Sequence, residues 1–213
     1  TYDGMDRLIE KKTGNEKTTY TYDELGLLIR VTDHTGTVTY QYDQYQRLTG
    51  TMDTRGNQLS YSYDETGRLK IFDNGFGATT YEYDLLDRVT RVIDHNGNAT
   101  VYEYDALGKR SAVRYPNGTV LTYTYDACQR LKEECVTDAN GNLLSRYTYG
   151  LGKAGERLTI TEETDGVTTE ISYIYDSLNR LVKETIKRNE NELTNEYTYD
   201  KVSNRISKTT TVT

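Results

Sequence analysis

Few side chains in this sequence have the types and spacing that metal or enzyme chemistry requires. The two histidines, His34 and His95, each follow an aspartate and lie three sequence repeats apart. A metal site needs its ligands close together, so we assign both histidines to turns. No Ser, His or Cys accompanies the many carboxylates in a triad-like arrangement. We therefore expect no enzyme activity, no metal ion and no cofactor.

Calcium binding and disulfide formation are two further possibilities for chemistry. The turns DHNGN (94–98) and DANGN (138–142) offer oxygen ligands, but they lack the glutamate that closes a calcium loop at its twelfth position. Cys128 and Cys135 lie along one chain direction, so a disulfide between them would require the strand to bend back. We expect structural turns and two free thiols.

The composition excludes several classes of protein. Of the 213 residues, 35% are hydrophobic, and the mean hydropathy is −0.80, so a thick two-layer core is hard to build. An aromatic content of 11% argues against disorder. A net charge of −7 and a pI near 5.0 argue against nucleic-acid binding. No apolar run approaches the roughly 20 residues that a membrane-spanning helix needs.

The tyrosines reveal an internal repeat. Of the 21 tyrosines, 18 form nine Tyr-x-Tyr pairs. The Tyr-Asp dipeptides recur in steps of 20 or 21 residues as far as Tyr125, and the later steps are 24 to 26 residues. About ten repeats fill residues 1–213, so we expect one repeat array. Because the chain begins inside a repeat without a signal peptide, we expect it to be a fragment of a longer tract.

The complete motif Tyr-x-Tyr-Asp occurs in eight repeats, and we assign its residues a structural role in each. They are Tyr20, Tyr22, Asp23, Tyr40, Tyr42, Asp43, Tyr61, Tyr63, Asp64, Tyr81, Tyr83, Asp84, Tyr102, Tyr104, Asp105, Tyr123, Tyr125, Asp126, Tyr173, Tyr175, Asp176, Tyr197, Tyr199 and Asp200. Glycines mark the other turn of many repeats, and we single out Gly36, Gly56, Gly97, Gly118 and Gly141.

Each repeat holds two strand-like runs and two kinds of turn. One run follows an Arg-Leu corner, as in RLTGTMD (47–53), and the other leads into the tyrosines, as in TVTYQY (37–42). The glycine turns supply the positive φ of tight hairpins. The aspartate after the tyrosines suits an Asx-type turn that caps backbone N–H groups. The pattern predicts an all-β fold, a long antiparallel meander of about 20 short strands.

Strand geometry indicates which face each side chain occupies. Because the period of a strand is two, both tyrosines of a pair point the same way, and the mostly polar residues between them point to a wet face. We expect the residues after each corner to share the tyrosine face: Leu28, Leu48, Leu69, Val89, Leu131 and Leu181. Twist should curl the sheet, aromatic face inward, into an open or partly closed barrel-like shell, roughly 30 Å across if it closes.

The tyrosine rows have two interpretations. Exposed aromatic rings can stack on sugars or apolar chains. Their presence in every repeat instead favours a role in holding the sheet together, because a binding site is usually a local exception in a repeat array. Cross-strand pairs of this kind contribute roughly 0.2–1 kcal/mol each.

The recurring phrase Tyr-x-Tyr-Asp-x-x-Gly-Arg-Leu, followed by Gly-Asn, resembles the Rhs/YD-repeat family over essentially residues 1–213. That family includes bacterial Rhs and wall-associated polymorphic toxins, shell components of insecticidal toxin complexes, and animal teneurins. The resemblance implies a secreted or cell-surface β-shell around a hollow interior, which in the bacterial toxins encloses a toxic C-terminal domain.

Two departures from the family pattern stand out. The closing region that carries the aspartate self-cleavage chemistry is not visible, and the only proline is Pro116. The repeat YTYGLGKAGERL (147–158) lacks the aspartate and inserts about three residues before its Arg-Leu, which indicates a local bulge or altered corner.

These features predict a structural β-shell segment that encapsulates or scaffolds a toxin-like polypeptide. The alternative is a repeat module that binds carbohydrate or another cell-surface ligand through its tyrosine rows. The expected partners are the rest of the shell and an enclosed C-terminal domain, with cell-surface glycans in the alternative and no nucleic acid. Uncovered edge strands further predict that the terminal repeats fray or associate with a second copy.

Overall fold

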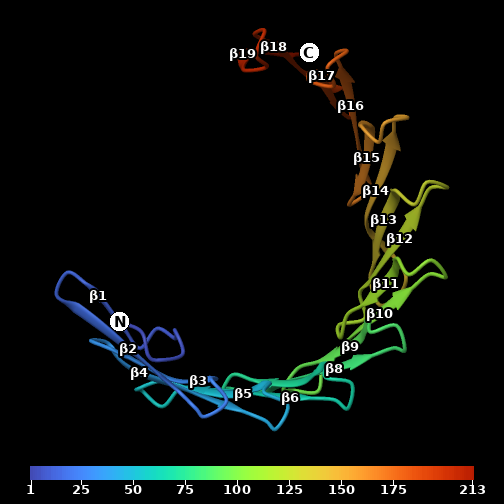
Figure 1. Cartoon of the computed structure of the whole chain (residues 1–213). Helices are drawn as coiled ribbons and strands as arrows, with labels where there is room; N and C mark the ends of the chain where they lie inside the picture. The colour runs from blue at the N-terminus through green and yellow to red at the C-terminus, as the bar shows by residue number, and fades with distance from the viewer. The chain divides into compact units, whose positions relative to one another are not determined.

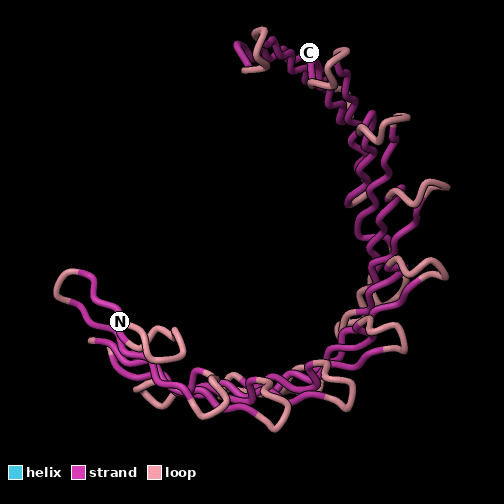
Figure 2. The backbone as a smooth tube through the Cα atoms, viewed as in Figure 1, coloured by secondary structure: helices cyan, strands magenta, loops and turns pink.

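The computed structural model describes all residues of the chain, 1–213. It contains 19 strands joined by short loops and no helix (Figure 2), and therefore no helix with the length and apolar character to cross a membrane. The strands are antiparallel, and each pairs with its neighbour in the sequence, so the chain runs as a meander (Figure 1). The predicted all-β meander is confirmed.

The chain divides into two compact units, Thr1–Ala99 and Thr100–Thr213. The strands of unit 1 are short because its repeats are short. They are β1 (Glu10–Thr13), β2 (Glu16–Tyr22), β3 (Leu28–Asp33), β4 (Gly36–Tyr42), β5 (Leu48–Met52), β6 (Gln58–Tyr63), β7 (Leu69–Asp73), β8 (Ala78–Tyr83) and β9 (Val89–Ile93).

Unit 2 contains the longer repeats, and its strands from β13 onward have seven to nine residues. They are β10 (Ala99–Tyr104, which starts at the last residue of unit 1), β11 (Arg110–Arg114), β12 (Val120–Tyr125), β13 (Leu131–Thr137), β14 (Leu143–Leu151), β15 (Arg157–Thr164), β16 (Val167–Tyr175), β17 (Leu181–Arg188), β18 (Asn191–Tyr199) and β19 (Arg205–Val212).

The sheet is open. Strand β1 pairs only with β2, and β19 pairs only with β18, so the closed ring considered from the sequence does not form. The strand number falls one short of the expected 20 because the first repeat contributes an isolated bridge, Tyr2↔Leu8, in place of a strand.

Within each unit the paired tyrosines lie on one face of the sheet. Tyr20 pairs with Val31, and Val31 with Val38, which precedes Tyr40 by two residues and therefore shares its face. The same register brings Tyr61 opposite Phe72, with ring centroids 5.3 Å apart. The residues expected after each corner pair directly with the second tyrosine, as Leu28 does with Tyr22. The predicted aromatic face is confirmed within each unit.

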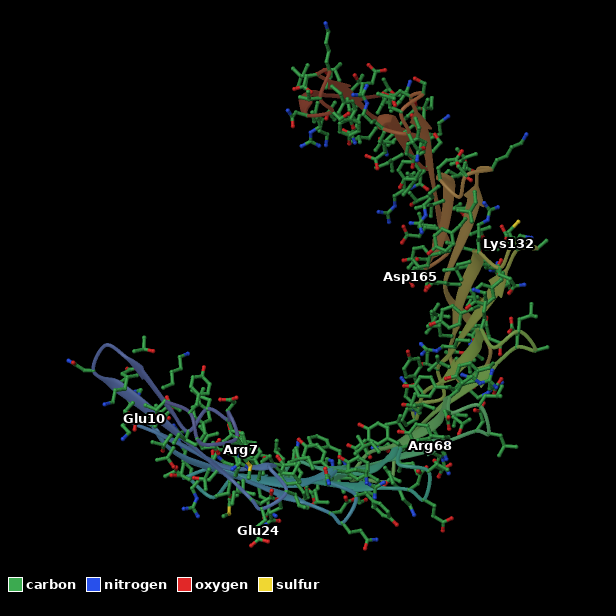
Figure 3. All side chains as sticks on the ribbon, in the orientation of Figure 1. Arg7, Glu10, Glu24, Arg68, Lys132 and Asp165 are labelled. Carbon is green, nitrogen blue, oxygen red and sulfur yellow. The ribbon has the colours of Figure 1, made fainter.

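The opposite face is less wet than expected. Ala112 and Val113 are adjacent in β11 and so lie on opposite faces, yet they are only 4% and 2% exposed. Ala112 shares its face with its ladder partners, Glu103 and Thr122. Within each unit the strands form a single layer, and side chains project from both of its faces (Figure 3). Packing is therefore distributed over two faces of a single layer.

The repeating corner as candidate functional site

Each aspartate of the Tyr-x-Tyr-Asp motif opens a five-residue turn, here called a corner. In the corner that Asp43 opens, the backbone N–H of Asp43 donates to the carbonyl of Arg47, and that of Gln46 donates to the carbonyl of Asp43. Oδ1 of Asp43 accepts the backbone N–H groups of Tyr45 and Arg47 at 2.8 and 3.0 Å. Gln46 has a φ of 63°, and glycine takes this position in other corners, as at Gly67. The aspartate thus has the Asx-type geometry that its sequence context indicates.

In six corners an arginine four residues after the aspartate completes the turn, whereas Leu27, Lys109 and Asn204 hold this position after Asp23, Asp105 and Asp200. Nε of Arg47 donates to Oδ2 of Asp43 at 2.7 Å. In the corner of Asp176, one carboxylate accepts bonds from the backbone N–H and the guanidinium of Arg180 and from the N–H of Leu178. These bonds lower the pKa of Asp176 below its ordinary value of 3.8. The Asp–Arg pairs are Asp3–Arg7, Asp43–Arg47, Asp64–Arg68, Asp84–Arg88, Asp126–Arg130 and Asp176–Arg180.

The second tyrosine of a pair fastens its repeat to the preceding one. The hydroxyl of Tyr42 donates to the carbonyl of Leu28 at 2.9 Å. The ladder between β3 and β4 ends at the pair Arg30↔Thr39, so this carbonyl lies beyond the last backbone pair. Equivalent bonds run from Tyr22 to Leu8, Tyr63 to Leu48, Tyr83 to Leu69, Tyr125 to Arg110, Tyr175 to Arg157 and Tyr199 to Leu181.

The corner arginine also reaches the next repeat. The guanidinium of Arg68 lies 4.8 Å from the ring centroid of Tyr83. Its Nη1 donates to the carbonyl of Asp84 at 3.0 Å and to Oδ1 of Asp87 at 2.7 Å. Cation–π contacts at exposed sites contribute about 0.5–1 kcal/mol. One arginine therefore joins its own aspartate, the next tyrosine and the next corner.

The altered repeat at 147–158 keeps the corner geometry with different side chains. Gly152 occupies the aspartate position: its N–H donates to the carbonyl of Glu156, and the N–H of Gly155 donates to the carbonyl of Gly152. The Glu156 carboxylate accepts the N–H of Ala154 at 2.9 Å and fills the space that a Cβ on Gly152 would need. The extra residues extend β14 to Leu151. The expected bulge or altered corner is confirmed: the strand register shifts between Gly150 and Leu151, and Glu156 supplies the carboxylate of the corner.

The first tyrosine of each pair has partners that change along the chain. Up to Val113 its direct cross-strand partner is apolar or Thr, as in Tyr102↔Val113. Later partners are charged: Tyr123↔Glu134, Tyr147↔Glu162, Tyr173↔Glu184 and Tyr197↔Lys208.

The later glutamates bind phenols and an amide. Glu134 accepts the hydroxyl of Tyr149 at 2.9 Å, and burial together with this bond raises the pKa of Tyr149 to about 12. Glu184 accepts the amide of Asn195 at 2.8 Å, and the hydroxyl of Thr210 donates to Asn195. Asn195 is the buried polar residue of the chain, and both ends of its amide are satisfied.

Four glycine turns at the other edge of the sheet, those opened by Asp53, Asp94, Tyr115 and Asp138, have the backbone hydrogen bonds of a corner. The turns between β1 and β2, β3 and β4, and β15 and β16 are two-residue hairpins. In the turn opened by Asp94, Oδ1 accepts two backbone N–H groups and Oδ2 accepts the side-chain amide of Asn98 at 2.9 Å. Asparagine stands here where arginine stands in a corner, so these turns share the corner geometry, whereas the turn at Gly36 does not. Positive φ values occur at Gly36, Gly56, Gly97, Gly118 and Gly141.

Close approach explains some of these glycines. A Cβ on Gly118 would overlap Ala139, and one on Gly36 would overlap Thr54, so the turns of successive repeats touch. His95 packs in the same way against Gly77. His34 lies in the turn between β3 and β4.

The remaining chemical candidates are dispersed. No group of three or more His, Cys, Asp or Glu side chains is placed to hold a metal ion. Both cysteines are free; Cys128 is exposed in a corner, and Cys135 is half-buried in β13. The motif residues direct their hydrogen bonds toward one another and toward the backbone. The corner is therefore an architectural site.

Family comparisons agree with this geometry. Residues 1–73 match the Teneurin YD-shell model, and residues 83–120 and 104–143 match the RHS Repeat model. The fold and its corners define a β-sheet protein of tandem repeats. Both matches agree with the Rhs/YD-repeat family that the sequence resembles. No curated protein matches the chain significantly.

Three solved structures are similar to the chain at low sequence identity. The chain is 14% identical to a crystal structure of TcdB2-TccC3-TEV, with a TM-score of 0.48. The aligned region covers 96% of this chain and 15% of that one. The Photorhabdus luminescens Tc holotoxin pore gives 13% identity and a TM-score of 0.49, with 95% and 18% covered. A porin-like protein from Bacteroides uniformis gives 16% identity and a TM-score of 0.35, with 95% and 86% covered. The chain thus spans less than a fifth of the first two relatives.

Proposed function

We propose that this chain is a wall segment of a β-shell that scaffolds or encloses a polypeptide. One observation carries the proposal: the tyrosine, aspartate and arginine of each motif bond to their own and the adjoining repeat, as Tyr42 does to Leu28 and Arg68 to Asp84. A motif whose polar groups bond to neighbouring repeats holds the sheet together, which is the role expected of a shell wall. The role is structural and includes no catalytic step.

The tyrosine face supplies the surface for an enclosed polypeptide. All the paired tyrosines are half-buried. A surface of half-exposed phenol rings offers both apolar contact and hydroxyl groups to an unfolded chain. The match to the YD-shell family supports a shell, and the resemblance to Rhs toxins supports a toxin-like guest domain and a secreted or cell-surface location.

A binding experiment tests the enclosed-polypeptide proposal. The 213-residue chain is titrated into a fluorescently labelled, permanently unfolded polypeptide such as reduced and carboxymethylated α-lactalbumin. We expect the anisotropy to rise, and the native disulfide-bonded form of the same probe to give no rise. Absence of binding to the unfolded probe would contradict enclosure through this face.

Matched variants assign the binding to one face. Replacing the first tyrosines with Tyr20→Thr, Tyr40→Thr and Tyr61→Thr should weaken binding, whereas Thr21→Ser, Gln41→Ser and Ser62→Thr on the opposite face should not. Circular dichroism checks that both triple variants retain the sheet. A glycan array run with the same proteins distinguishes the alternative: binding to glycans, lost in the tyrosine variant and without binding to the unfolded probe, would favour a carbohydrate-binding module.

A further inference from the structure

The tips of the corners carry a row of exposed apolar side chains. The residue two positions after the corner aspartate has its backbone N–H capped, as Leu25 is by Asp23 at 2.9 Å, while its side chain points to solvent. Seven of these side chains are 67–76% exposed: Met5, Leu25, Tyr45, Leu86, Leu107, Leu178 and Val202. Leu85, beside Leu86, is fully exposed. Together these residues define the corner edge.

The opposite edge of the sheet shows that the turn does not require an apolar residue there. Asp53, Asp94 and Asp138 open turns with the same backbone and carboxylate hydrogen bonds. The equivalent residues at this edge are Arg55, Asn96 and Asn140. Since the same turn forms with polar residues, the apolar row on the corner edge is not required by the turn; among the turns at the opposite edge a single large apolar side chain, Phe76, is comparably exposed. Rows of exposed apolar side chains mark interaction surfaces.

Charge divides the corner edge between the two units. At the three tip positions after each corner aspartate, unit 1 carries acidic residues and no lysine or arginine: Asp6, Glu24, Glu65 and Asp87, of which Asp87 is paired with Arg68. Figure 3 shows Glu24 projecting away from the strands. The corresponding positions of unit 2 carry Lys153 and Lys201 and no acidic residue. The two segments of the corner edge therefore have opposite charge at their tips.

We propose that the corner edge binds a second copy of this chain, with the unit 1 segment of one copy against the unit 2 segment of the other. Two features select this partner. Successive apolar tips are two strands apart, roughly 10 Å, and a second copy presents the same spacing. The acidic tips then face lysines, which lowers repulsion and fixes the alignment. The contact leaves the tyrosine face free for the role proposed above.

Sedimentation of the whole chain tests the proposal. We expect concentration-dependent self-association of the wild type. The variant Leu25→Asn/Leu86→Asn/Leu107→Asn/Leu178→Asn, which gives the corner edge the residue found at the opposite edge, should weaken association tenfold or more, a loss of about 1.4 kcal/mol or more. The matched control Arg55→Ser/Asn96→Ser/Asn140→Ser alters the opposite edge and should leave association unchanged.

Charge reversal tests the alignment and remains informative if the asparagine variant unfolds. Glu24→Lys/Glu65→Lys should weaken association, and adding Lys153→Glu/Lys201→Glu should restore it. A monomeric wild type would overturn the proposal and indicate that a different segment or domain covers this edge. Association that survives both the asparagine and the charge variants would also overturn it, because β1 or β19 pairing would then be the contact.

Discussion

The carboxylate of Glu156 occupies the space that an aspartate side chain at Gly152 would fill. Gly152 is buried at the first position of its corner, where the other corners carry aspartate, and the N–H of Ala154 is capped by Glu156. Gly152 has no carboxylate, and Glu156, four residues later, places its own carboxylate in the same position. The corner survives because the cap depends on where the carboxylate lies.

This exchange predicts a strong coupling between the two positions. Gly152→Asp alone should lower the unfolding midpoint, because two carboxylates would compete for one space, and Glu156→Arg alone should lower it by removing the cap. The double variant restores the usual Asp–Arg pair and should be more stable than the sum predicts by about 0.5–3 kcal/mol. Urea unfolding of the four proteins measures this. Additive effects would contradict a shared carboxylate position.

Removing the hydroxyl that links successive repeats should cost stability. Tyr42→Phe and Tyr199→Phe each delete a bond to a carbonyl, at 2.9 and 2.7 Å. We expect a loss of about 0.5–1.5 kcal/mol from each in urea unfolding. Tyr2→Phe is the control, since Tyr2 is 66% exposed. Equal effects at all three positions would show that the bonds contribute nothing specific.

The buried amide of Asn195 should be the most sensitive polar side chain in unit 2. Asn195→Leu leaves the Glu184 carboxylate and the Thr210 hydroxyl without this partner. The expected loss is about 1–3 kcal/mol, because buried polar groups lose their solvation without compensation. Asn96→Ala, in an exposed turn, should change stability by less than about 0.5 kcal/mol. A neutral Asn195→Leu variant would show that the network is dispensable.

Acid should weaken the corners. Bonds from the Arg130 backbone and guanidinium lower the pKa of Asp126, and those from Arg180 lower that of Asp176. A depressed folded pKa gives stability that is complete above the ordinary value of 3.8 and lost as pH falls through the folded value. Urea midpoints should stay level from neutral pH to about 5 and then fall. In Asp176→Asn the fall should be shallower, and an unchanged acid slope would contradict the assignment.

One phenol should ionise later than the rest. The pKa of Tyr149 is raised from 10.0 to about 12 by burial and by its bond to Glu134. Its folded pKa is raised, so this contribution to stability is complete below pH 10 and disappears as pH rises through about 12. Ultraviolet titration should show one phenol that ionises at a higher pH than the others, and Glu134→Gln should lower the pH at which it ionises. Identical titration curves for the two proteins would refute the pairing.

The sequence was sufficient for the repeat, the strand pattern and the tyrosine face, because each depends on spacing alone. Tyr20 and Tyr22 are two residues apart, and strand geometry leaves them one shared face. The role of Glu156 was not foreseen, since the motif places the carboxylate at the first turn position and the sequence there reads as a loss. The bond from Tyr42 to Leu28 was also missed, because its acceptor is a main-chain carbonyl that no residue type identifies.

The assumption of one wet face failed at β11 for a reason of size. Ala112 has a small side chain between Glu103 and Thr122, its two ladder partners. Glu103 also pairs with Arg114 at 2.6 Å, so longer side chains surround the alanine and cover it. Polar residues can therefore shield a small neighbour across strands, and an alternating sequence pattern alone does not reveal this.

The link from the second tyrosine runs backward to the preceding repeat, to a carbonyl as from Tyr63 to Leu48, or to the Glu134 side chain in the case of Tyr149. A gene duplication that adds one repeat therefore adds its own attachment to whatever precedes it, and a deletion removes both together. Arrays of this kind can gain or lose length by recombination without redesign of the adjoining strands. Such modular growth would allow one local chemistry to generate walls of many sizes.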